Sequence, residues 1–155
     1  MNASADSSGA EYRNQLAEMI RRSERIVVTE HSYAFDAYDS KAGKSLIPDE
    51  VVYGTHELSG GQADFFLDTV NGLDPRTQDA VTACIFEPHH TIRFYAADES
   101  VSTMKICFKC AQVEWDGSEL DPPWALYTGL AAVVKAAGFS PERDWQALAQ
   151  QHLVK

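Results

Sequence analysis

The chain has 155 residues, of which 45% are hydrophobic and 23% are charged. These values are ordinary for one compact globular domain, so a fibrous or largely disordered protein is excluded. The formal net charge is −10, because 13 Lys and Arg residues stand against 23 Asp and Glu residues. This surplus of acidic residues argues against nucleic acid and anionic membranes as partners, since both require clustered cations.

The N-terminal segment gives the first expectation about domain organisation. Residues 1–10 are small and polar and lack the apolar region of a signal peptide. We therefore expect a flexible tail over residues 1–10, a single domain over residues 11–155, and a cytoplasmic protein. The composition also suits a tether left after removal of the leader of a periplasmic protein or lipoprotein, and that alternative stays open. No run of about 18 apolar residues is present, so we expect no membrane-spanning helix.

The sequence of the first half of the domain predicts a β-hairpin with one helix before it and one helix after it. Apolar residues at helical spacing predict an amphipathic helix over residues 11–23. The β-branched segment 26–29 and the segment 50–57 predict two strands joined by a broad turn. Ser59 then provides a good N-cap for a helix that ends near Gly72.

A second hairpin is expected in the middle of the chain. Residues 83–86 and 91–96 alternate between apolar and polar side chains, as in a half-buried strand that Pro88 interrupts. Over residues 104–115 the apolar residues change phase, which predicts a β-bulge near Cys110 in the returning strand.

Two helices complete the chain. One follows Pro122-Pro123 and ends at Gly138, and the other begins near Ser140. The inward-facing residues expected in the first of them are Leu126, Leu130, Val133, Val134 and Ala137. Because hairpins rather than crossovers connect the strands, we predict a single α+β domain with an antiparallel sheet of about four strands and helices packed on one face.

All three cysteines and two adjacent histidines lie in one pattern, C-x4-H-H-x16-C-x2-C. A hairpin brings His90 opposite Cys107, and a one-residue change of register brings His89 there instead. Opposed side chains in an antiparallel pair are close enough for a thiolate and an imidazole to share a tetrahedral zinc ion. The candidate zinc ligands are therefore Cys84, His89, His90, Cys107 and Cys110.

The same residues allow two other interpretations. Lys105 and Lys109 flank Cys107, and nearby cations favour a thiolate. Cys107 with Cys110 as resolving thiol would then form a thiol-dependent redox or transfer enzyme, with a neighbouring histidine as base. Cysteine is also often fully buried, so the cysteines can be small core residues and the histidines simple hydrogen-bonding groups.

A third group of polar residues follows the first predicted strand. Glu30 and His31 stand at the end of that strand, and Asp36 and Asp39 come soon after. Such residues can form an acid/base pair or a site for a hard metal ion. Spacing alone does not establish either, and a solvated hairpin loop is the preferred interpretation.

The cysteine-rich segments also carry a resemblance. Residues 83–94 and 106–110 resemble an uncharacterised bacterial family with a CF-x-P-H-H/R-H-G strand followed by an ICF-x-C strand, and residues 57–63 look like the helix start of that family. Two departures are visible, because Ile85 interrupts the Cys-Phe pair and Thr91 stands where glycine is common. The family has no assigned activity, so the resemblance implies no function. Its members often look exported, which supports the periplasmic alternative.

No serine or cysteine stands in the sequence context of a known nucleophile. We therefore hypothesise a non-enzymatic binding or regulatory module, in which the Cys/His cluster, with or without zinc, fixes a rigid hairpin. The thiol-dependent enzyme remains open. A further hypothesis treats the charge of −10 as functional and gives an acidic inhibitor or immunity-type protein that binds a basic partner. The sequence leaves the oligomeric state open.

Overall fold

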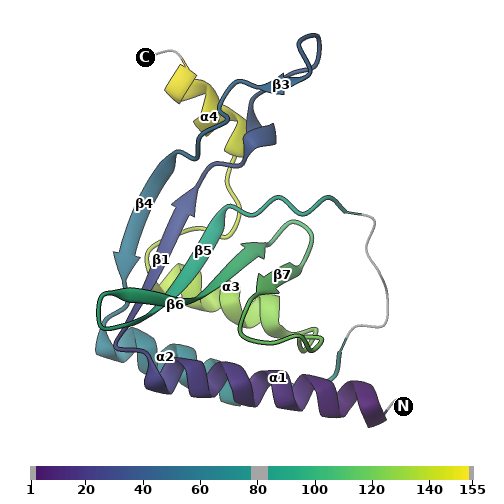
Figure 1. Ribbon diagram of the computed structural model, residues 1–155, viewed down its shortest axis with the longest axis vertical. Helices are drawn as coiled ribbons and strands as arrows, with labels where there is room; N and C mark the ends of the chain where they lie inside the picture. The colour runs from purple at the N-terminus through teal and green to yellow at the C-terminus, as the bar shows by residue number, and fades with distance from the viewer. Residues whose placement is uncertain (1–2, 78–83, 154–155) are drawn as a thin grey trace.

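The computed structural model describes residues 3–77 and 84–153. Within them, four helices accompany a five-stranded antiparallel sheet of order β4-β1-β5-β6-β7 and a small sheet formed by β2 and β3 (Figure 1). The helices are α1 (Ala3–Arg22), α2 (Gly60–Asn71), α3 (Leu126–Ala136) and α4 (Trp145–Leu153). The strands are β1 (Arg25–His31), β2 (Tyr38–Asp39), β3 (Lys44–Ser45), β4 (Val52–Glu57), β5 (His90–Ala96), β6 (Glu99–Cys107) and β7 (Gln112–Trp115).

The predicted α+β domain with an antiparallel sheet is confirmed, although the sheet has five strands rather than about four. The pairing of β1 with β4 confirms the first hairpin. Ser59 caps α2 as predicted, because its hydroxyl accepts a hydrogen bond from the Gln62 backbone N–H at 3.1 Å. Among the described residues, no helix combines the length and the apolar composition needed to cross a membrane.

Helix α1 begins earlier than the sequence indicated. It starts at Ala3 rather than at residue 11, so residues 3–10, predicted to be a flexible tail, are helical. These residues lack an apolar stripe, and tertiary contacts hold them instead. Gly9 approaches the Pro75 backbone so closely that a Cβ atom would collide with it, and the Asp121 backbone N–H donates to the Ser8 hydroxyl at 3.3 Å.

The second hairpin also differs from the prediction. Instead of a bulge near Cys110, β6 ends at Cys107 and a turn with Ala111 at φ 52° leads into β7. This turn explains the change of apolar phase. Across β5 and β6, His90 pairs with Ile106 and not with Cys107. The strand predicted over residues 83–86 is absent at residues 84–86, and residue 83 lies outside the described residues.

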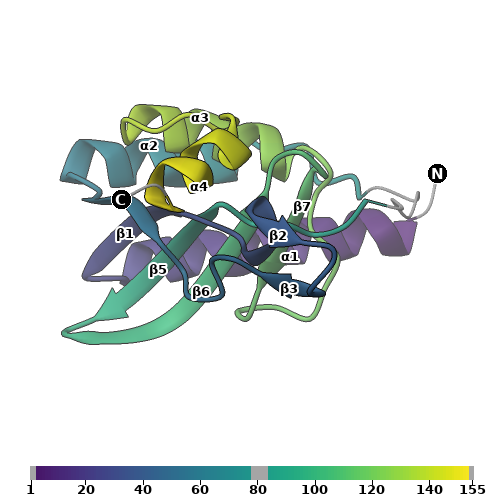
Figure 2. The ribbon, with the colours of Figure 1, turned by 90° about the horizontal axis from the view of Figure 1, so that it is seen from above.

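The core lies between one face of the large sheet and helices α1, α2 and α3 (Figure 2). Its strand residues alternate with residues of the other face, as the period of two in a β-strand requires. The buried strand residues on this face include Ile26, Val28, Ile92, Phe94, Met104 and Ile106. The inward-facing residues predicted for α3 are all buried, which confirms that prediction.

Two polar residues occupy strand positions that face the core, next to apolar residues on the same face. Glu30 follows Ile26 and Val28 on β1, and His90 stands directly opposite Glu30 on β5. Both side chains are therefore directed to the core side, at the end of the sheet where the segment leading into α4 lies. Arg143 from that segment contacts Glu30, and the Trp145 ring contacts the His90 ring.

Candidate functional site

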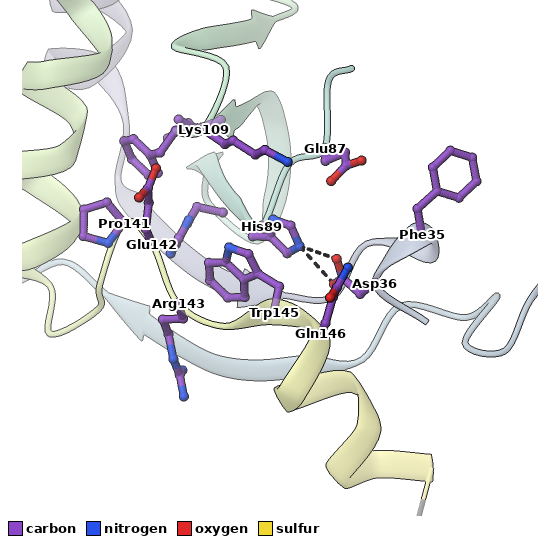
Figure 3. Close-up of a pocket in the computed structure, with 13 residues that line it drawn as sticks. Phe35, Asp36, Glu87, His89, Lys109, Pro141, Glu142, Arg143, Trp145 and Gln146 are labelled. Atoms are coloured by element: carbon purple, nitrogen blue, oxygen red, sulfur yellow. Dashed lines mark hydrogen bonds and ion pairs between the residues drawn. The ribbon is translucent and has the colours of Figure 1, made fainter. Parts of the chain in front are cut away.

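A cavity of about 450 Å³ lies at this end of the sheet (Figure 3). Four parts of the chain form its walls: the 3-10 turn at Ala34–Asp36, residues 87–90, the end of β6 with the following turn, and the start of α4. The lining residues are Phe35, Asp36, Glu87, His89, His90, Ile106, Phe108, Lys109, Pro141, Glu142, Arg143, Trp145 and Gln146. The cavity therefore combines aromatic, apolar and charged side chains.

His89 and Asp36 form a buried pair on one wall. The His89 Nε2 lies 2.8 Å and 2.9 Å from the two carboxylate oxygens of Asp36, and the two residues are only 6% and 7% exposed. Because a carboxylate accepts, Nε2 carries the proton and donates it to Asp36. The Trp145 ring stacks on the His89 ring at 4.1 Å with an interplanar angle of 6°. The pair and the stacked ring together fix the orientation of the imidazole.

His90 and Glu30 form the deepest polar group of the site. They are 0% and 2% exposed, and the His90 Nε2 lies 3.4 Å from the Glu30 Oε2. Arg143 bonds to the other oxygen of Glu30. Both ring nitrogens of His90 and the Oε2 of Glu30 have no hydrogen-bond partner among the described residues.

The environment of His90 opposes a positive charge on its ring. Burial lowers the pKa of His90 to about 3, and the neighbouring His31, His89 and Arg143 act in the same direction. The Ser140 backbone acts in the opposite direction and raises the pKa of His90, but the effect of burial is larger. His90 is therefore a neutral imidazole at pH 7, with one nitrogen that donates and one that accepts.

The cysteines occupy different surroundings from those expected. Cys84 and Cys110 form a disulfide, and Cys107 is a free thiol that is 1% exposed. The redox hypothesis required a pair between Cys107 and Cys110, and Cys110 pairs with Cys84 instead. The disulfide joins the segment that leads to His89 with the turn that follows β6, so it connects two walls of the cavity.

The five predicted zinc ligands do not form one group. Two sulfurs are joined to each other, His89 bonds to Asp36, and His90 faces Glu30. Cys107 follows Ile106 on β6, so strand alternation directs it to the opposite face of the sheet. Within residues 3–77 and 84–153, no group of three or more His, Cys, Asp or Glu residues is arranged to hold a metal ion.

The solvated loop preferred for Glu30, His31, Asp36 and Asp39 was wrong for the first three residues, which are buried. Asp39 is half-buried and accepts hydrogen bonds from backbone N–H groups of the exposed turn after β2. The His31 Nδ1–H donates to the Ser32 carbonyl at 2.9 Å, and its Nε2 accepts from the Thr91 hydroxyl at 2.7 Å. Burial is the main cause that lowers the pKa of His31. The phase of Glu30 with Ile26 and Val28 was the signal that could have placed it inside.

Arg143 and Trp145 are site residues that the sequence analysis did not assign to a site. Trp145 was expected only as a packing residue of the last helix, and its contact with His89 joins segments far apart in the chain. No local pattern around either residue indicates this contact.

Comparison of the chain with models of protein families, with curated proteins and with solved structures gives no match. The resemblance of residues 83–94 and 106–110 to an uncharacterised bacterial family therefore stays a prediction.

Proposed function

We propose that the protein is a non-enzymatic binding module whose ligand enters the cavity at the start of α4. The observation that carries this proposal is the state of His90, a fully buried side chain that lines the cavity while both its ring nitrogens lack a partner. An unsatisfied buried polar group costs about 1–3 kcal/mol, so such groups are rare without a functional reason. A ligand that bonds to His90 would recover this free energy.

The construction of the walls limits the rearrangement to the local shift by which a ligand donor reaches the buried ring nitrogens of His90. The Cys84–Cys110 disulfide joins two walls, and the His89–Asp36 pair joins a third segment to them. Trp145 then holds the start of α4 against His89. Walls that are fixed before the ligand arrives lose little conformational entropy on binding.

A thiol-dependent activity has less support. Cys107 is buried, and Cys110 is already paired with Cys84. The proposal also includes no zinc, because the sulfurs of Cys84 and Cys110 are joined to each other.

We propose in addition that the protein works in an oxidising compartment, since disulfides persist there and are rare in the cytosol. The Cys84–Cys110 bond supports the periplasmic alternative over the cytoplasmic one. Alkylation of the thiols in protein that is denatured directly from cells, without reductant, tests this. We expect one reactive cysteine in the denatured protein, and three would contradict the proposal.

The binding proposal is tested by nuclear magnetic resonance on the ¹⁵N-labelled full chain. The probes are a panel of free amino acids, small amines and small carboxylates at millimolar concentration. We expect at least one probe to shift the signals of residues around the cavity, including the Trp145 indole N–H.

The control variants place a bulky side chain inside or outside the cavity. Gln146 lines the cavity and is exposed, so Gln146→Trp should block binding. Gln151→Trp, at an exposed position of α4 outside the cavity lining, should leave binding unchanged. Shifts that persist in Gln146→Trp, or a panel without any shift around the cavity, would overturn the proposal.

A further inference from the structure

The unsatisfied hydrogen-bonding atoms of His90 and Glu30 define which hydrogen-bonding group a ligand must have. If the Nε2 of His90 carries the proton, it points toward Glu30 and the Nδ1 remains an acceptor without a donor. If the Nδ1 carries the proton, the Nε2 and the Glu30 Oε2 are two acceptors facing each other at 3.4 Å. With either tautomer an acceptor lacks a donor, so the missing partner is an N–H or O–H group.

The charges around the cavity favour a cationic donor. Asp36 is paired with His89, and Arg143 is paired with Glu30. The lining charges that form no ion pair with another described residue are those of Glu87, Glu142 and Lys109. Figure 3 shows Lys109 extending toward Glu87. Two carboxylates therefore stand against one ammonium group, and the chain as a whole carries a net charge of −10.

The remaining lining suits a short apolar body. Ile106, Phe108 and Pro141 contribute apolar surface, and the Phe108 ring lies edge-on to the His90 ring at 5.3 Å. An alkyl chain attached to the donor would pack against this surface beside His90. Aromatic rings also attract a nearby cation.

We propose that the ligand of the cavity is a primary alkylammonium, whose N–H groups donate to His90 and whose charge is balanced by Glu87 and Glu142. This inference rests on the proposed binding function and specifies its ligand class. The ammonium supplies the donor that either tautomer of His90 requires. Its alkyl part occupies the surface of Ile106 and Phe108.

The test compares four small probes of similar size at pH 7: n-butylammonium, tetramethylammonium, 1-butanol and butyrate. Tetramethylammonium has the charge without a donor, 1-butanol has a donor without the charge, and butyrate has the opposite charge. Resonance titrations of the full chain should give the tightest binding for n-butylammonium, localised to the cavity.

Two variants connect this binding to named side chains. His90→Phe keeps an aromatic ring but removes the acceptor, and it should weaken n-butylammonium binding about tenfold, whereas His152→Phe at an exposed position should not. Glu142→Gln should weaken binding about threefold, with Glu119→Gln as its control. Because Glu142 is exposed, Glu142→Gln tests the balance of charge even if His90→Phe does not fold, and unchanged binding of n-butylammonium to Glu142→Gln would contradict a cationic ligand.

The outcomes separate this inference from the binding function. If 1-butanol or butyrate binds the cavity at least as tightly as n-butylammonium, the ligand class is wrong and the binding function stands. If tetramethylammonium binds equally well, or if His90→Phe binds n-butylammonium normally, the role of His90 as acceptor is wrong. If none of these probes and no member of the wider panel shifts the cavity signals, both proposals fail.

Discussion

Glu30 and His90 stand directly opposite each other on β1 and β5, with their side chains on the same face as the hydrophobic core. The sheet therefore ends its apolar face with a carboxylate and an imidazole rather than with two more apolar residues. Arg143 contacts the carboxylate, and the cavity opens beside the imidazole. This position explains why the polar pair is buried although His90 lines a cavity.

The pKa of His90 predicts a specific dependence of stability on pH. Its folded-state value of about 3 is below the ordinary value, so the unfolded chain binds a proton that the folded chain does not bind between about pH 6.5 and pH 3. The free energy of unfolding should fall as the pH is lowered through this window, by up to about 1.4 kcal/mol per pH unit from this residue. Urea unfolding at a series of pH values measures this slope.

His90→Phe should have a shallower slope than the wild-type chain in the same window, while His152→Phe should keep the wild-type slope. Equal slopes for all three proteins would show that His90 is charged in the folded state.

The Cys84–Cys110 disulfide should stabilise the fold by about 3 kcal/mol, because it closes a loop with a sequence separation of 26. The double variant Cys84→Ser/Cys110→Ser should unfold at a lower urea concentration, and a dithiol reductant should lower the stability of the wild-type chain but not that of the double variant. Cys107→Ala is the matched control, since its sulfur lies outside the disulfide. A wild-type chain that is indifferent to reductant would contradict this expectation.

The His89–Asp36 pair should behave as one energetic unit. Asp36→Leu and His89→Phe should each destabilise the fold by about 3 kcal/mol, because each removes the hydrogen-bonding group and leaves its buried partner without a hydrogen bond. The double variant should cost clearly less than the sum of the two single variants. Chemical denaturation of the four proteins gives this coupling free energy, and strictly additive losses would argue against the pair.

Trp145 should hold the start of α4 against the cavity. Its stacking on His89 and its contacts with His90 and Tyr53 predict that Trp145→Ala releases α4 locally. Hydrogen exchange should become faster for the backbone N–H groups of residues 145–153, while α1, α2 and α3 keep their protection. Gln151→Ala on the same helix is the control, and equal exchange in both variants would refute this role of Trp145.

The sequence predicted those parts of the fold that depend on local periodicity. The β-branched segment of β1, the alternation in β5, the Ser59 cap of α2 and the buried stripe of α3 all follow from patterns within a few residues. The start of α1 was missed because Gly9 is held by contact with Pro75, and the tight turn after Cys107 was mistaken for a bulge. Both errors concern contacts or turns that an apolar pattern does not encode.

The candidate site could be predicted only in part. The sequence directed attention to His89, His90 and the cysteines, but it placed them in one metal cluster. The structure divides them between a disulfide, a His–Asp pair and a His–Glu pair, each made with a residue distant in the chain. Residue spacing alone does not determine such partners.

The connection made by Cys84 and Cys110 affects how this molecule should be handled on the bench. Purification buffers often contain dithiothreitol, which would cut the covalent link between the segment before β5 and the turn after β6. Screening for ligands under those conditions would sample a chain in which the two sides of the cavity are free to move apart. Samples prepared without reductant are the appropriate starting material for every titration.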